Sequence, residues 1–140
     1  MADIATLLQA QANGQGKILF RFGDLVKDFH IHVIFATNKL IATRPDAIRS
    51  FLEAWFETIR FMRTDKARTV EIAKDIISVD PAITARTYDE LMPMFSDDGK
   101  FSPKALAVLS RSYGDLKILP AEPDMSKFYT EEFLPQNVFR

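Results

Sequence analysis

The chain has 140 residues, of which 47% are hydrophobic, with 12 Phe and only 5 Gly. A chain of this length can bury about 68% of its unfolded surface, so we expect one hydrophobic core and no general disorder. The net charge of −1 comes without a basic block, and Cys is absent, which excludes a nucleic-acid partner, disulfides and thiol chemistry.

The first residues predict a short helix. Apolar side chains recur at helical spacing from Ile4 to Ala12, and Gly14 ends the pattern. Polar residues interrupt every apolar run near Met1, so we expect no signal peptide in the chain as written. The longest apolar stretch is also shorter than the roughly 20 residues that span a bilayer.

Two short strands are predicted next. Residues 17–22 and residues 30–36 are rich in strand-forming side chains, and Gly23 and Asp24 form a turn pair after the first run. The connection over residues 25–29 is too short for a crossover helix. We therefore expect two strands that need not pair in parallel.

About four helices are predicted from Pro45 onward. Proline at a first helical position indicates three of the starts, at Pro45, Pro81 and Pro103, and Thr64 is the expected cap of the remaining helix. The first of these helices has a broad apolar stripe, which we expect to form core rather than a ligand cage: Ile48, Phe51, Leu52, Trp55, Phe56, Ile59 and Met62. The proline-rich, aromatic residues 118–140 are expected to dock on the body of the protein or on a partner.

The first candidates for site chemistry are the two histidines of the chain. His30 and His32 share one face of the second predicted strand, so both could contact one metal ion, but two ligands do not make a site. We expect no metal site and no catalytic residue, and interpret both as surface or pocket-lining side chains. The alternative is a small enzyme that uses His30, His32 and Asp24. The basic cluster at residues 60–68 is expected to be a solvated face with intrahelical pairs rather than an anion site.

Two stretches carry a resemblance to a known family. The run over residues 41–54 reads IATRPDAIRSFLEA, and residues 128–135 near the other end read FYTEEFLP. Together with Asp98-Gly99 and Pro123-Asp124-Met125, they resemble the C-terminal part of ABC-transporter substrate-binding proteins of the nitrate, sulfonate, taurine and thiamine-precursor class. The resemblance covers about residues 17–135.

The resemblance implies an α/β fold, namely the helix-rich C-terminal portion of a two-lobed periplasmic-binding-protein-like fold. It divides the chain into residues 1–40, a remnant of the second lobe with hinge strands; residues 41–117, a helical region; and residues 118–140, the docking tail. Because the usual first lobe and export signal have no counterpart, we expect a C-terminal fragment or a truncated gene product.

The implied function is capture of a small organic solute, such as a sulfonate, pyrimidine or aromatic acid, for a membrane permease in the periplasm. This is a non-enzymatic function without a cofactor, and the nearest candidates for ligand contact are Asp24, Phe29 and His30. Helices shaped for an absent sheet would expose apolar stripes, so we expect a homo-oligomer. The alternative is a helical protein–protein interaction module without a small-molecule ligand.

Overall fold

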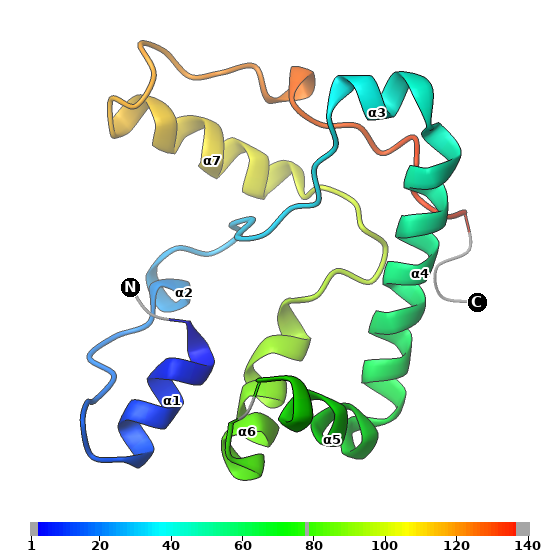
Figure 1. The fold of residues 1–140 in the computed structure, drawn as a ribbon. Helices are drawn as coiled ribbons and strands as arrows, with labels where there is room; N and C mark the ends of the chain where they lie inside the picture. The colour runs from blue at the N-terminus through cyan, green and yellow to red at the C-terminus, as the bar shows by residue number, and fades with distance from the viewer. Residues whose placement is uncertain (1–2, 78, 137–140) are drawn as a thin grey trace. The chain divides into compact units, whose positions relative to one another are not determined.

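The computed structural model describes residues 3–77 and 79–136, apart from the side chain of Ile77. Parts of the predicted ranges 1–40 and 118–140 therefore lie outside the described residues. Helices make up 61% of the structure, and no described residue belongs to a strand (Figure 1). The fold is all-helical, and the predicted α/β class with two short strands is wrong.

The two predicted strands are absent from the described residues, because strand propensity alone does not make a sheet. A strand needs a neighbour that accepts and donates its backbone hydrogen bonds, and an isolated pair of strands is at best marginally stable in water. Residues 17–20 and residues 27–36 adopt no regular structure. The predicted turn pair, Gly23 and Asp24, instead lies inside a short helix, α2 (Phe22–Leu25).

Most of the predicted helices are present, and local capping explains where they begin. Helix α1 (Ile4–Ala12) follows Asp3, which accepts a hydrogen bond from the Thr6 backbone N–H. Helices α6 (Pro81–Leu91) and α7 (Pro103–Asp115) follow Asp80 and Ser102, each of which caps a helix with proline in its first turn.

Two local predictions need correction. Helix α5 (Lys66–Ile77) is capped by Asp65, whose carboxylate accepts from the Arg68 N–H at 2.9 Å. The expected cap, Thr64, instead ends helix α4 (Pro45–Thr64) and donates its hydroxyl to the Arg60 carbonyl. Helix α3 (Asn38–Thr43) was not predicted at all, although Thr37 caps it and is a signal for it in the sequence.

The described residues form two compact units that share helix α4. Unit 1 combines the residues up to Phe20 with Ala54–Asp97, and unit 2 combines Arg21–Glu53 with the described residues from Asp98 onward. Each unit thus contains segments from distant parts of the chain. The first turns of α4 belong to unit 2 and its remainder belongs to unit 1.

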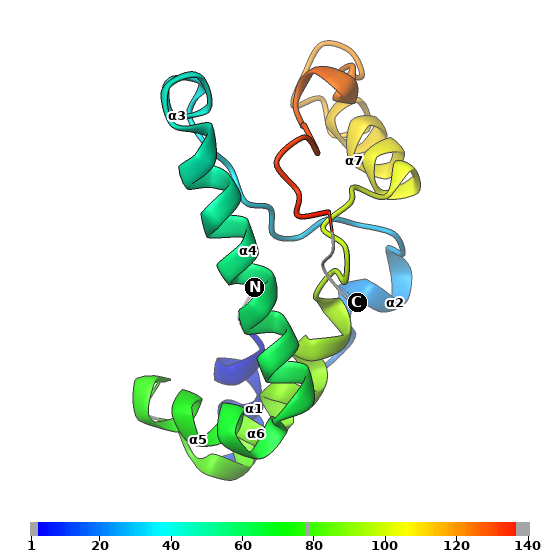
Figure 2. The same cartoon turned by 90° about the vertical axis from the view of Figure 1, so that its right-hand side faces the viewer.

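Unit 1 has a core formed between helices. Helix α6 packs against α1 and α5 and continues into the short 3-10 helix η1 (Met92–Met94) (Figures 1 and 2). The buried apolar side chains come from four of its elements: Leu8, Phe56, Ile59, Ile83 and Met92. The Tyr88 hydroxyl donates to the Met62 carbonyl at 2.6 Å and ties α6 to α4.

Unit 2 buries fewer large side chains. Its buried apolar residues are Leu52, Ala105, Leu106 and Phe133. Helix α7 contacts the 3-10 helix η2 (Met125–Lys127), and the Ser110 hydroxyl donates to the Pro123 carbonyl at 2.8 Å. These contacts fold the chain after α7 back along that helix, as the yellow and orange segments of Figure 1 show.

The apolar stripe of α4 is only partly core. Leu52, Phe56 and Ile59 are buried, as predicted, at the spacing of one side of a helix. Phe51 is exposed and Trp55 retains 38% of its accessible surface, although its ring lies 6.3 Å from that of Phe95. The expectation that the whole stripe is core is therefore wrong for these two rings.

Candidate functional site

Segments that are far apart in the sequence meet at His30 in unit 2. The Ser102 backbone N–H, 72 residues away, donates to His30 Nε2 at 3.1 Å. The imidazole also meets the Phe101 ring edge-on, with the ring centroids 5.2 Å apart. These two contacts hold His30 half-buried beside the first residues of α7.

The chain near its C-terminus completes this group of residues. The Tyr129 ring lies 4.7 Å from that of Phe101, and Glu131 Oε1 accepts a hydrogen bond from the Phe101 N–H at 2.8 Å. We refer to His30, Phe101, Ser102, Tyr129 and Glu131 as the His30 cluster. It is the place in unit 2 where a histidine, a carboxylate and two aromatic rings come together.

The hydrogen bond from Ser102 determines what His30 can do chemically. A backbone N–H can only donate, so Nε2 must be the acceptor, and the neutral ring carries its proton on Nδ1. His30 can accept a proton at Nε2 only by giving up this bond. The arrangement therefore suits a positioned ring that offers an aromatic edge and an N–H donor. It does not suit a general base.

The three predicted ligand-contact residues do not come together. Of Asp24, Phe29 and His30, only His30 belongs to the cluster. Asp24 lies in α2 and is exposed, with its backbone N–H donating to the Arg21 carbonyl. Phe29 is also exposed.

Sequence reasoning did not assign Phe101 or Glu131 to a site. Tyr129 and Glu131 belong to the predicted docking tail and to the resembling stretch 128–135, neither of which assigns them a site role. The spacing along the chain gives no signal that links these residues to His30, because their contacts depend on how unit 2 folds. The proline start at Pro103 indicates that Ser102 caps a helix, but not that its N–H meets a histidine.

The two histidines differ in their surroundings. His32 is exposed, whereas His30 is engaged with Phe101 and Ser102. Within residues 3–77 and 79–136, no group of three or more His, Cys, Asp or Glu side chains could hold a metal ion. Asp24, His30 and His32 therefore do not form a ligand set in this part of the chain.

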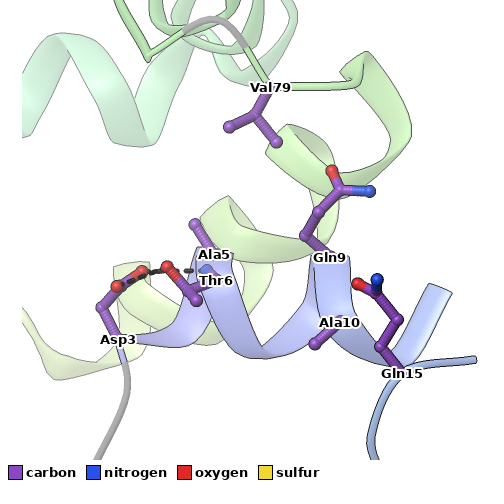
Figure 3. A pocket seen from close by; sticks show the side chains of 7 residues that line it. All are labelled: Asp3, Ala5, Thr6, Gln9, Ala10, Gln15 and Val79. Atoms are coloured by element: carbon purple, nitrogen blue, oxygen red, sulfur yellow. Dashed lines mark hydrogen bonds between the residues drawn. The ribbon is translucent and has the colours of Figure 1, made fainter. Parts of the chain in front are cut away.

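A shallow hollow of about 490 Å³ lies on unit 1, between α1 and the residue Val79 that precedes α6 (Figure 3). Three of its polar side chains, those of Asp3, Thr6 and Gln9, already bond to groups in or next to α1. Asp3 accepts from both the backbone N–H and the hydroxyl of Thr6, which lowers the pKa of the Asp3 carboxyl below its ordinary value. Gln9 donates to Asn13. The hollow thus offers helix-capping groups rather than a set of side chains aimed at a ligand.

The basic cluster at residues 60–68 faces acidic partners. Arg63 pairs with Asp97 at 2.7 Å, and Lys66 pairs with Asp89 at 2.6 Å. The first pair joins α4 to the loop after η1 and the second joins α5 to α6, so neither lies within one helix. Arg68 forms the expected kind of intrahelical pair, with Glu71.

No family model matches the chain, and no curated protein or solved structure matches it. No helix in the described part of the chain is both long enough and apolar enough to cross a bilayer.

Proposed function

We propose that this chain takes part in the capture of a small organic solute for an ABC importer, as the resemblance of residues 41–54 and 128–135 implies. The proposal concerns function alone. It does not carry over the two-lobed α/β fold, because the described residues form no sheet. In this role the protein would work in the periplasm beside a membrane permease.

One contact between distant segments supports the proposal most directly. Arg49 lies in the first of the two resembling stretches, and its Nη1 donates to the Glu132 carbonyl, 83 residues away in the second stretch, at 2.7 Å. The same guanidinium lies 5.1 Å from the centre of the buried Phe133 ring. The two stretches that suggested the family therefore contact each other within unit 2, which supports their belonging to one inherited substructure.

The His30 cluster is the ligand-contact surface that this function would use. The Phe101 and Tyr129 rings provide flat apolar faces, and His30 provides a donor at Nδ1. Ligand sites commonly combine apolar walls with a few placed polar groups. This combination suits an aromatic acid, a pyrimidine or a sulfonate.

A thermal-shift screen of these three solute classes tests the proposal. A ligand that binds only the folded state at one hundred times its Kd stabilises it by about 2.7 kcal/mol. We expect a solute that stabilises the unaltered protein to lose this effect in His30→Ala. The matched control, His32→Ala, changes an exposed histidine and keeps the response. The proposal fails if no solute of these classes shifts the transition.

A second candidate is a helical protein–protein interaction module. Phe51 and Trp55 favour it, because both are exposed and lie one helical turn apart on α4, as do the anchors of helices that dock in grooves. The two functions differ in the solute screen. A module that binds only proteins shows no solute response, whereas under the first proposal Phe51→Ala with Trp55→Ala leaves that response unchanged.

A further inference from the structure

His30 is the main anchor of the chain that connects α2 and α3 (Figure 1). Residues 23–29 and 31–35 are all exposed, whereas His30 is half-buried against Phe101 and its Nε2 accepts the Ser102 N–H at 3.1 Å. Ala36 is the other half-buried residue of this stretch, and its methyl group makes no polar bond. The attachment of residues 23–36, which we call the linker, therefore depends chiefly on one imidazole.

The hydrogen bond between Ser102 and His30 requires a neutral ring. An imidazolium carries a proton on both nitrogens, so a protonated His30 has no lone pair to offer the Ser102 N–H. Protonation also brings a positive charge to the N-terminus of α7, where the helix dipole is already positive. Histidine is the side chain whose charge ordinarily changes between pH 5 and pH 8. Both effects therefore weaken the contact as the pH falls through this range.

We propose that His30 is a pH-sensitive attachment point: the neutral ring holds the linker to the start of α7, and protonation of the ring releases it. Helix α7 keeps its cap during release, because the Ser102 hydroxyl accepts the Ala105 N–H at 3.3 Å without help from His30. Release separates His30 from Phe101 and so takes apart the His30 cluster. The release does not rest on the proposed function, because its tests use no solute.

The charged groups around this contact carry both signs. Glu131 is the carboxylate of the His30 cluster, and its Oε1 accepts the Phe101 N–H at 2.8 Å. The Asp98 carboxylate accepts the Lys100 N–H at 2.9 Å. The other ionisable residues within 27–33, 98–104 and 129–132 are Lys27, Asp28, His32, Lys100, Lys104, Tyr129 and Glu132. A Glu131 that paired with the protonated ring would hold the linker more firmly in acid, which is the opposite of release.

Amide exchange at Ser102 tests the proposal, with the rates corrected for the intrinsic pH dependence of exchange. We expect the protection of this amide to fall about fivefold between pH 8 and pH 5, as the loss of one net hydrogen bond implies. The Ser126 amide, which donates to the Asp124 carboxylate, should keep its protection over the same range. Unchanged protection at Ser102, or protection that rises in acid, overturns the proposal.

His30→Gln separates titration from the structural role of the side chain. A glutamine carbonyl can accept the Ser102 N–H but does not titrate, so we expect this variant to protect Ser102 equally at pH 5 and pH 8. His30→Ala should leave the Ser102 amide unprotected at both pH values. The matched control, His32→Gln, changes the exposed histidine and keeps the acid response. An acid response that persists in His30→Gln, or disappears in His32→Gln, overturns the assignment to His30.

A spin label on the linker measures its release directly. The chain has no Cys, so Ile31→Cys provides a single attachment point at a side chain that is 68% exposed. The nitroxide spectrum should sharpen between pH 8 and pH 5, because a released linker moves faster. Ile76→Cys, at an exposed position of α5, should give the same spectrum at both pH values. Equal sharpening at the two positions would mean that acid loosens the whole protein, and it overturns a local release.

Discussion

Units 1 and 2 depend on different kinds of contact. In unit 1, helices α1, α5 and α6 pack on one another, and two of its buried side chains, Leu8 and Ile59, are almost completely enclosed. In unit 2, bonds between side chains and backbone join distant segments, as in the contacts of Ser102 with His30 and of Arg49 with Glu132.

This difference has a consequence for stability. A large buried apolar side chain contributes roughly 1.5–3 kcal/mol, whereas a typical hydrogen bond contributes a net of about 1 kcal/mol. Unit 2 buries fewer large apolar side chains, so we expect its amide protons to exchange before those of unit 1. Helix α4, shared by both units, should then exchange fastest near Pro45.

The largest expected effect comes from opening the core of unit 1. Ile59→Ala removes buried methyl groups and should lower the free energy of unfolding by about 2–5 kcal/mol. Urea denaturation followed by circular dichroism measures this loss. Ile76→Ala, at an exposed position of α5, is the control and should change stability by less than about 0.5 kcal/mol. Similar losses in both variants would mean that unit 1 has no helix-packed core.

A smaller loss is expected when the link between α4 and the chain end in unit 2 is removed. Arg49→Ala deletes the hydrogen bond to Glu132 and the contact with the Phe133 ring, at a cost of about 1–2 kcal/mol. Hydrogen exchange should quicken at residues 131–134 and leave α6 unchanged. Arg111→Ala, an exposed arginine of α7, provides the control. Equal hydrogen exchange at residues 131–134 in the two variants would show that Arg49 does not stabilise this segment.

Two threonines of α6 should respond in opposite directions. Thr87 Oγ1 is buried and has no hydrogen-bond partner among the described residues, so Thr87→Val should stabilise unit 1 by up to about 1 kcal/mol. Thr84 is also buried, but its hydroxyl donates to the Asp80 carbonyl at 3.0 Å, so Thr84→Val should cost about 1 kcal/mol. Thermal unfolding of the two variants measures the contrast, and a shift of both in the same direction would contradict it.

The smallest expected effect is the weakening of two helix caps at low pH, Asp3 in unit 1 and Asp124 in unit 2. Hydrogen bonds from the Thr6 backbone N–H and hydroxyl lower the pKa of Asp3 below its ordinary value of 3.8. Those from the Ser126 hydroxyl and N–H lower the pKa of Asp124 in the same way. A depressed folded-state pKa gives stability that is present above pH 3.8 and lost as the pH falls through the lower, folded value.

Amide exchange at Thr6 and Ser126 measures the two caps separately. Protection at both amides should decline only below about pH 4. Asp3→Asn should remove most of this acid dependence at Thr6 while leaving that at Ser126 intact. Unchanged acid dependence at Thr6 in this variant would show that another group titrates there.

The sequence allowed the helix starts to be predicted because the interactions that set them are local. Asp80 with Pro81, and Ser102 with Pro103, satisfy the first N–H groups of helices a few residues away, so their pattern is visible without a fold. The exposed histidine at position 32 and the half-buried one at position 30 could not be told apart in this way. Their difference depends on Phe101 and Ser102.

Tertiary structure alone decided the fold class and the candidate site. Residues 30–36 have the composition of a strand, but a strand exists only where another segment supplies its backbone partners, and the described chain supplies none. The contacts of His30 with Ser102 and of Arg49 with Glu132 likewise join residues whose distance along the chain carries no information about their distance in space. Local patterns determine where a helix begins, whereas only the packed chain determines which side chains meet.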